Sequence, residues 1–280
     1  MENKEDLLKR IDCLDKGFVR LVDFMGTDDS IVQAARVSYG KGTKSVRADR
    51  ELIRYLMRHR HTSPFEMVEF KFHVKLPIFV ARQWIRHRTA NVNEYSGRYS
   101  EMKDEFYIPD IDQIRTQNTV NRQGRSDSVL PQSQAQEINE MLSKTQQGLF
   151  EEYKSMLDMD IARELARINL PLSTYTEWYW KIDLHNLLHF LKLRLDFHAQ
   201  YEIRVFAAAM GELIKPIVPM TYEAFEDYMI NSENFSRQEI NIIKSLINQK
   251  MPDDEYLAQF EIKGLEATEF KAKLKKLIIE

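Results

Sequence analysis

The run Met67-Val68-Glu69-Phe70-Lys71-Phe72-His73-Val74-Lys75-Leu76 alternates apolar and polar side chains strictly from Val68 onward, and Pro77 follows it. Because successive side chains of a β-strand point to opposite faces, this pattern predicts a strand over 67–76 with one buried face. Proline is favoured at the first position of a helix, so a helix is expected directly afterwards, over 77–87.

Hydrophobic spacing predicts further elements on both sides of this strand and helix. Strands are expected over 17–25 and 175–182. Helices are expected over 28–37, 47–59, 135–159, 183–194 and 198–214. Two of these helices begin with capping residues, because Asp183 can accept from its first turn and Ser133 with Gln136 can form a capping box.

Three segments stand apart from these elements. The stretch 88–97 is polar and is predicted to be a loop that returns over the end of the preceding helix. The stretch 112–134 is rich in Gln, Asn, Ser, Arg and Gly and is expected to be a mobile loop, because long loops in compact domains are usually functional or disordered. A main domain over 1–230 is expected to be followed by a helical extension over 231–280, with Ser236 and Glu239 as a capping box.

The composition narrows the class of protein. The chain has 280 residues, of which 43% are hydrophobic and 30% charged, as in ordinary soluble globular proteins. A formal net charge of -3 provides no overall basic field for a nucleic-acid partner. The single cysteine, Cys13, excludes an intrachain disulfide framework and fits a reducing cytoplasm. No apolar stretch reaches the ~18 residues that a membrane helix needs.

The most informative local pattern is the run Arg86-His87-Arg88-Thr89-Ala90-Asn91-Val92-Asn93-Glu94-Tyr95-Ser96-Gly97-Arg98. Guanidinium groups match phosphate oxygens two at a time, and Ser96 and Gly97 add a hydroxyl and an unobstructed backbone N–H. Glu94 is an acceptor suited to ribose hydroxyls or to orienting an arginine. The segment therefore predicts a site for a nucleotide-like anion. Taken alone, Arg86 to Arg88 could equally be a solvated helix end, where cations are also favoured.

Arg-His-Arg, seven residues and then Ser is also the signature motif of flavin-dependent thymidylate synthases, which this chain resembles. Further blocks similar to that family follow in the family's order between about Asp15 and about Phe225. They are Gln33-Ala34-Ala35-Arg36-Val37-Ser38, His61-Thr62-Ser63-Pro64-Phe65-Glu66, Pro77-Ile78-Phe79-Val80-Ala81-Arg82-Gln83-Trp84, Arg98-Tyr99-Ser100, Arg167-Ile168-Asn169-Leu170-Pro171-Leu172, and Leu193-Arg194 with His198-Ala199-Gln200.

The resemblance implies an α+β fold in which long helices pack on an antiparallel sheet, with a flavin site that is not of the Rossmann type. The sequence agrees on the last point, because Gly40-Lys41-Gly42 lacks the third glycine of a dinucleotide fingerprint. The resemblance further implies a homotetramer with active sites at subunit junctions.

The resemblance also implies roles for individual residues. Deoxyuridine monophosphate (dUMP) would be held by Gln83, Arg86, Glu94, Ser96, Gly97 and Arg98. FAD would face Arg86, His87, Arg88 and Glu94, with Ser63 and Glu66 beside His61 on the flavin and solvent side. Asp183, His185 and His189 stand at flavin-contact positions where relatives often carry Asn or Arg.

Two further arginines stand within apolar runs, where an isolated charge must be paired. For Arg167, the alternatives are a salt bridge with a carboxylate such as Glu164 and, by resemblance, a phosphate or uracil contact from a neighbouring subunit. For Arg194, the resemblance implies the catalytic role of stabilising the anionic, N3-deprotonated character of uracil.

The implied reaction makes dTMP from dUMP, with methylenetetrahydrofolate as the one-carbon donor and FAD, reduced by NADPH, as the hydride source. It needs no protein nucleophile, and two acidic residues near Cys13 are expected to raise the pKa of its thiol. No metal is expected, because His59-Arg60-His61 with Glu66 is not a zinc-protease spacing. The alternative class is a non-enzymatic protein that binds single-stranded nucleic acid through the arginine-rich helix, Tyr95 and Tyr99.

Overall fold

The computed structural model describes residues 7–37, 46–119, 122, 124–246 and 252–275 of the chain. Its centre is a five-stranded antiparallel sheet with the strand order β1-β2-β3-β7-β4. The strands are β1 (Arg10–Cys13), β2 (Gly17–Met25), β3 (Glu69–Pro77), β7 (Tyr175–Asp183) and β4 (Asn91–Glu94). In the central pair, β3 and β7 run side by side over nine residues without a register shift, from Glu69↔Asp183 to Pro77↔Tyr175.

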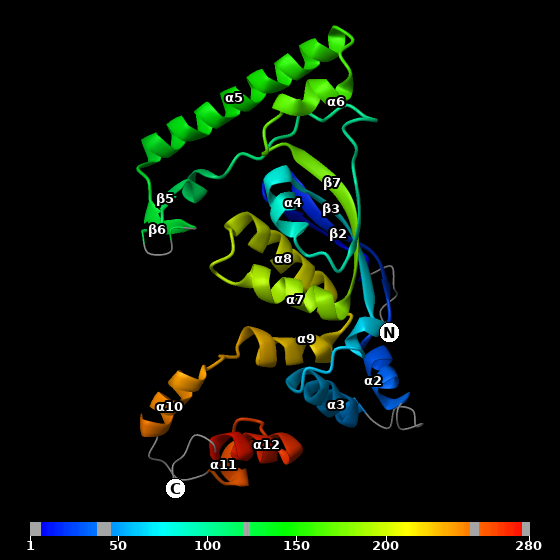
Figure 1. Ribbon diagram of the computed structural model, residues 1–280, viewed down its shortest axis with the longest axis vertical. Coiled ribbons are helices and arrows are strands. Elements are labelled where there is room, and N and C mark those ends of the chain that lie inside the picture. The colour runs from blue at the N-terminus through cyan, green and yellow to red at the C-terminus, as the bar shows by residue number, and fades with distance from the viewer. Residues whose placement is uncertain (1–6, 38–45, 120–121, 123, 247–251, 276–280) are drawn as a thin grey trace.

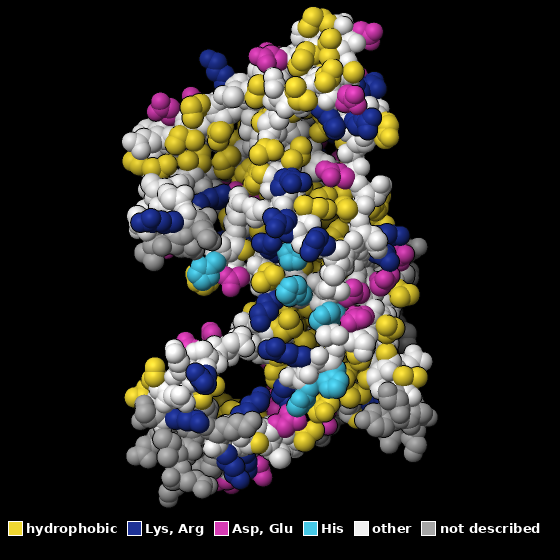
Figure 2. All heavy atoms as spheres, viewed as in Figure 1, with side chains coloured by type: hydrophobic (Ala, Val, Ile, Leu, Met, Phe, Trp, Pro, Cys, Tyr) yellow, Lys and Arg dark blue, Asp and Glu magenta, His cyan; other side chains and the backbone are white. Residues whose placement is uncertain are grey.

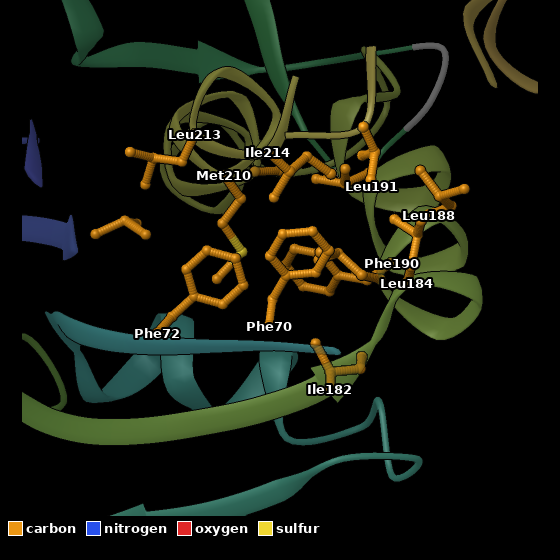
Figure 3. Close-up of a cluster of buried hydrophobic side chains, with 14 of the residues drawn as sticks. Phe70, Phe72, Ile182, Leu184, Leu188, Phe190, Leu191, Met210, Leu213 and Ile214 are labelled. Atoms are coloured by element: carbon orange, nitrogen blue, oxygen red, sulfur yellow. The ribbon is translucent and has the colours of Figure 1, made fainter. Parts of the chain in front are cut away.

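One face of this sheet is covered by α4 (Ile78–Trp84), α7 (Leu184–Leu195) and α8 (Tyr201–Ile214) (Figure 1). The alternating apolar side chains on this side of β3 and β7, such as Phe70, Phe72 and Trp180, point into this layer and are almost completely buried. Figure 3 shows Phe70 and Phe72 facing Leu188 and Phe190 of α7 and Met210 of α8. The predicted α+β architecture, with helices packed on an antiparallel sheet, is therefore confirmed.

The other face of the sheet carries the polar half of the alternation. Lys181 bridges to Glu69 at 3.1 Å, and His73 reaches Glu177 at 3.0 Å. Cross-strand pairs of opposite charge stabilise a solvated sheet face, which explains why the polar residues of β3 tolerate this position.

The remaining helices extend the molecule in both directions along its long axis (Figure 1). At one end lie α5 (Gln132–Asp158) and α6 (Arg163–Ala166), followed by the 3-10 turn η4 (Arg167–Asn169). Towards the other end lie α2 (Asp28–Arg36), α3 (Val46–Arg58), α9 (Pro219–Phe225) and the π-helical turn η5 (Glu226–Ile230). The C-terminal helices α10 (Arg237–Leu246), α11 (Asp254–Ala258) and α12 (Gly264–Lys275) lie beyond them.

Several local predictions are confirmed within a residue or two. The strand over 17–25 is found with those bounds, and the strand over 175–182 is one residue longer. Asp183 caps α7, because its carboxylate accepts from the backbone N–H of Asn186 at 2.9 Å. Ser236 and Glu239 exchange the two hydrogen bonds of a capping box, at 2.7 and 3.3 Å. Ser38 and Gly40-Lys41-Gly42 lie outside the described residues.

Other predictions are wrong in instructive ways. The presumed loop over 88–97 contains β4, whose four residues are all exposed and pair with the open edge of β7. Backbone pairing at an edge needs no apolar alternation, so the side-chain pattern could not show this strand. The presumed loop over 112–134 contains the turn η3 (Ile111–Gln113) and a short hairpin of β5 (Arg115–Gln117) and β6 (Arg125–Val129).

Two helix starts and one strand start also differ from the predictions. The helix expected over 135–159 begins at Gln132 directly after Pro131, without a side-chain cap from Ser133. The helix expected from 198 begins at Tyr201, because Asp196 holds His198 in a turn by accepting from its backbone N–H at 2.8 Å. The strand expected from 67 begins at Glu69, because Phe65–Met67 form a 3-10 turn, η2. None of the helices in the described ranges is long and apolar enough to cross a membrane.

Candidate functional site

The predicted anion-binding run begins where α4 ends, and one tryptophan fixes that end. Trp84, the last helical residue, is fully buried and packs against Trp178, Trp180 and Phe190 with ring centroids 5.6, 5.3 and 4.7 Å away. Burial of such aromatic clusters is among the largest packing contributions in a core. The chain therefore leaves the helix at a rigid point, with the Arg86-His87-Arg88 turn at the surface above α7.

Arg194 meets this turn from the last part of α7. Its Nε donates to Nε2 of His87 at 3.1 Å, and its terminal nitrogen donates to the backbone carbonyl oxygen of Gln83 at 3.4 Å. Burial, followed by the nearby charges of Arg194 and His189, lowers the pKa of His87 to about 4. A neutral imidazole can accept through Nε2, whereas a protonated one cannot, so the low pKa and the hydrogen bond agree. Burial also lowers the pKa of Arg194.

The residues predicted to face the flavin lie along α7 and beside it. The His87 ring lies 6.3 Å from the ring of His189, one turn of α7 after His185. The turn η2, which includes Glu66, contacts α7, and Leu184 donates to Val68 just beyond it at 2.8 Å. The structure thus brings the Ser63 to Glu66 segment to the same helix as His185 and His189.

Asp183 has a structural role in addition to any contact with a cofactor. One of its carboxylate oxygens accepts from the backbone of Asn186, and the other accepts from the Asn186 side chain at 2.7 Å. A cap of this kind typically contributes about 1 kcal/mol to helix stability. Asp183 therefore stabilises the start of α7, the helix that carries His185, His189 and Arg194.

Glu94 lies in β4 and is held towards the helical face of the sheet. It pairs with Trp178 of β7, and opposite residues in an antiparallel pair project to the same side. The hydroxyl of buried Thr176 donates to Glu94 at 2.8 Å. The sequence offered no signal for Thr176, since a threonine within a strand is usually only a strand former.

The Ser96-Gly97-Arg98 turn lies against Arg167. A Cβ atom on Gly97 would lie 3.2 Å from the Arg167 side chain and 2.8 Å from the sulfur of Met102, so a larger residue here would have to displace these side chains. Arg98 donates from its backbone to the Ser96 hydroxyl at 3.3 Å. The close approach of Gly97 and Arg167 occurs within one chain.

Of the two alternatives for Arg167, the salt bridge with Glu164 is wrong. Glu164 pairs with Arg98 at 3.1 Å, and both of these side chains are more than half exposed. Arg167 itself is exposed, as are Ile168 and Leu172 beside it, so the apolar run does not bury the guanidinium. The Arg167 side chain has no hydrogen-bond or ion-pair partner among the residues that the structure describes, so its guanidinium is available to an anion.

Arg86 and Arg88 are likewise exposed, and neither pairs with any other described residue. Figure 2 shows histidine side chains gathered in the middle of one face of the molecule among Lys and Arg side chains. Unpaired guanidinium groups near one another repel unless an anion lies between them. The residues present therefore fit a dinucleotide cofactor and a nucleotide, both of which bring phosphate groups. The described part of the chain has no group of three or more His, Cys, Asp and Glu residues that could hold a metal ion.

Comparisons with known proteins define the class to which this fold and site belong. The family model described as "Thymidylate synthase complementing protein" matches residues 20–220. The flavin-dependent thymidylate synthase of Ehrlichia ruminantium (strain Gardel) is 59% identical over 244 residues, which are 87% of this chain and 82% of that relative. The flavin-dependent thymidylate synthase of Treponema denticola is 56% identical over 267 residues, 95% of this chain and 97% of that relative.

A solved structure agrees with this class. The UMP/dUMP methylase PolB from Streptomyces cacaoi, bound with 5-Br dUMP, superposes with a TM-score of 0.71 at 36% identity. The match covers 80% of this chain and all of that one. The chain belongs to the flavin-dependent thymidylate synthase family, as the Arg-His-Arg motif predicted, and it is a methyltransferase enzyme. The alternative of a non-enzymatic nucleic-acid-binding protein is therefore wrong.

Proposed function

We propose that this enzyme makes dTMP from dUMP, with methylenetetrahydrofolate as the one-carbon donor and NADPH as the reductant of its FAD. The observation that carries the proposal is the pairing of Arg194 with a neutral His87, next to the unpaired Arg86 and Arg88. The names of the relatives support the nucleotide product and the flavin. We further propose a cytoplasmic homotetramer in which residues 1–230 form the catalytic domain and 231–280 an extension.

The nucleotide phosphate is proposed to bind at the Ser96-Gly97-Arg98 turn, with Arg167 beside it. Gly97 offers a backbone N–H without an obstructing side chain, and the phosphate would displace Glu164 from Arg98. The displacement costs little, because an exposed ion pair contributes only about 0–1 kcal/mol. A dianionic phosphate replaces it with stronger, two-pronged hydrogen bonds.

Arg194 is proposed to activate the uracil ring. His87 accepts the hydrogen bond from Nε of Arg194 and thereby fixes the plane of the guanidinium. The terminal N–H groups of Arg194 are then left for the N3–C2=O edge of uracil. Partial burial strengthens the field of this cation, so it favours the negative charge that develops on the ring. When bound and reduced, the flavin supplies hydride to that ring. The flavin is proposed to be held by Ser63, Glu66, Arg86, His87, Arg88, Glu94, Asp183, His185 and His189.

The proposal assigns no role to a protein nucleophile. Cys13 is 1% exposed in β1, and burial, with smaller contributions from Asp12 and Glu212, raises the pKa of its thiol to about 12. Burial, rather than the acidic neighbours expected from the sequence, is the larger cause. A thiol of this kind is almost wholly protonated at neutral pH and is out of reach of a substrate.

The test is single-turnover flavin spectroscopy on the Arg194→Lys variant. This variant keeps the charge but loses the planar, multi-donor geometry. It is expected to bind FAD and to be bleached by NADPH, while anaerobic reoxidation by dUMP with methylenetetrahydrofolate slows about 10²–10³-fold, as for loss of a charge-stabilising donor. Lys192→Arg, on the same part of α7, is the control and should behave as wild type. If NADPH fails to reduce the flavin while reoxidation is normal, Arg194 belongs to the flavin site, and its assignment to uracil activation is wrong.

A further inference from the structure

A buried carboxylate lies two hydrogen bonds behind Gln83, a residue of the expected nucleotide site. Glu202, in the first turn of α8, is 1% exposed. One of its oxygens accepts from the Tyr107 hydroxyl at 3.0 Å and from the guanidinium of Arg125 in β6. Its other oxygen accepts from the side-chain amide of Gln200 at 2.8 Å. Donors from three separate segments therefore satisfy this charge, as a buried carboxylate requires.

The hydrogen bonds of this carboxylate determine the orientation of two amides. An ionised carboxylate only accepts, so Gln200 must turn its NH₂ group towards Glu202. The carbonyl oxygen of Gln200 then faces Gln83, whose NH₂ group donates to it. Gln83 is therefore left with its carbonyl oxygen, Oε1, which accepts no hydrogen bond from the residues that the structure describes. Without Glu202, both amides could rotate by half a turn with little cost, because their two ends are nearly the same shape.

We propose that Glu202 is a positioning residue that, through Gln200, makes Gln83 present a hydrogen-bond acceptor to the nucleotide. This inference rests on the proposed function and on the contact between Gln83 and dUMP that the family resemblance implies. Apart from its phosphate, dUMP has two donors, the ring N3–H and the 3′-hydroxyl, and the acceptor on Gln83 recognises one of them. The hairpin of β5 and β6 contributes to this arrangement through Arg125, which pairs with the Glu202 carboxylate at the far end of the series of hydrogen bonds.

The experiment measures nucleotide affinity by calorimetry on the full-length, flavin-loaded enzyme. The ligands are dUMP, 3-methyl-dUMP, which lacks the N3–H, and 2′,3′-dideoxyuridine monophosphate, which lacks the 3′-hydroxyl. In the wild type, one analogue is expected to bind about tenfold more weakly than dUMP through loss of its bond to Gln83. The variant Gln83→Leu identifies that analogue, because it should abolish the difference.

Glu202→Gln is the decisive variant, since it keeps the size of the side chain but can donate as well as accept. It is expected to reduce the same tenfold difference to less than about threefold, because the Gln83 amide then occupies both orientations. Gln200→Met removes the hydrogen bonds between Glu202 and Gln83 by a change at an exposed position, and it leaves buried Glu202 in place. It is expected to have the same effect. This second variant keeps the test valid if Glu202→Gln fails to fold.

The outcomes separate the inference from the function on which it rests. A full tenfold difference retained in Gln200→Met or in folded Glu202→Gln would overturn the positioning role. If Gln83→Leu weakens binding of dUMP but leaves both analogue differences unchanged, Gln83 touches the nucleotide without acting as an acceptor, and the inference is again wrong. If Gln83→Leu changes neither affinity nor selectivity, the proposed contact between Gln83 and dUMP fails as well.

Discussion

At the scale of single residues, the chemistry of this site depends on which groups are left without partners. Arg86, Arg88 and Arg167 pair with no other described residue, whereas Arg194 is held by His87 and by the backbone of Gln83. Free guanidinium groups are suited to capture anions, and a fixed guanidinium is suited to act on one defined position of a substrate. This difference separates the proposed binding arginines from the proposed catalytic one.

The first prediction concerns the charge state of His87. Its imidazole should titrate near pH 4 in the folded enzyme, as measured by NMR of its ring protons. In Arg194→Met the pKa of His87 should rise, because a repelling charge is removed, but burial should keep it below 6.5. A value near 6.5 in the wild type would show that the imidazole is solvated and does not hold Arg194.

The same shift has a consequence for stability against pH. The folded pKa of His87 lies below the unfolded one, so between about 4 and 6.5 the unfolded chain binds more protons. The contribution of His87 to the free energy of unfolding is therefore complete above pH 6.5 and is lost as the pH falls towards 4. Denaturant titrations of the wild type and His87→Asn across this range should show a steeper loss for the wild type.

The second prediction concerns the phosphate. Arg98→Ala should weaken dUMP binding by about 1.5–3 kcal/mol, the usual range for a hydrogen bond to a charged group, without lowering flavin content. Glu164→Gln is the matched control, since it removes the competing ion pair at 3.1 Å and should leave binding equal or slightly tighter. Calorimetry with dUMP measures both variants, and unchanged affinity in Arg98→Ala would rule out this anchor.

At the scale of elements, two arginines of α3, one helical turn apart, attach the C-terminal helix α12 to the rest of the molecule. Arg50, Arg54 and Arg58 stand along α3, and Arg54 and Arg58 are only 14% and 8% exposed. Arg54 pairs with Glu266 of α12 at 3.4 Å, and Arg58 pairs with Glu269 at 2.6 Å. The attachment thus includes two partly buried ion pairs. A cavity of about 1010 Å³ is lined by residues from both sides of the contact.

The third prediction follows from this ionic contact. Burial opposes ionisation of Glu266, but hydrogen bonds from Tyr228 and Arg54 outweigh it and hold the pKa of this carboxylate below its ordinary value. Its contribution is therefore present above the ordinary pKa of 4.5 and is lost as the pH falls below that value. We expect the amides of α12 to lose protection from hydrogen exchange in acid, while those of β3 keep theirs.

The matched variants are Glu266→Gln with Glu269→Gln, which remove both charges and keep the shapes. They should deprotect α12 at neutral pH by more than the about 0–1 kcal/mol of an exposed ion pair, because both carboxylates are only about one-fifth exposed. Glu255→Gln, an exposed carboxylate of α11, is the control and should change nothing. Protection of α12 that survives the double change would mean that apolar contacts hold the extension.

At the scale of the whole molecule, the contacts within one chain join the proposed nucleotide residues into two groups. One group is Gln83 and Arg194, together with His87, which accepts from Arg194, and the other is the Ser96 to Arg98 turn with Arg167. We expect a complete site to take one group from each of two neighbouring subunits of a tetramer.

The fourth prediction tests this arrangement by mixing subunits. Arg194→Lys and Arg98→Ala should each be weakly active alone, while co-expression of the two should restore about a quarter of the sites by random pairing in a closed oligomer. The measurement is turnover per bound flavin in the mixed preparation. Activity no higher than the average of the two parent variants would place both groups in one subunit.

The sequence alone determines those structural features that depend on interactions between residues close together in the chain. The strict alternation of β3, the cap at Asp183 and the capping box at Ser236 act over a few residues, so local patterns reveal them. The anion-binding run from Arg86 to Arg98 is equally local, because its charges stand together in the chain whatever the fold.

Other features exist only because distant segments meet. The edge strand β4 is defined by the backbone of β7, some 85 residues later, and its own side chains carry no strand pattern. Glu164 pairs with Arg98 instead of Arg167, and the neutral state of His87 results from burial beside Arg194, more than 100 residues away. Burial and partner choice are properties of three-dimensional neighbourhoods, so no local pattern could predict that Glu202 lies behind Gln83.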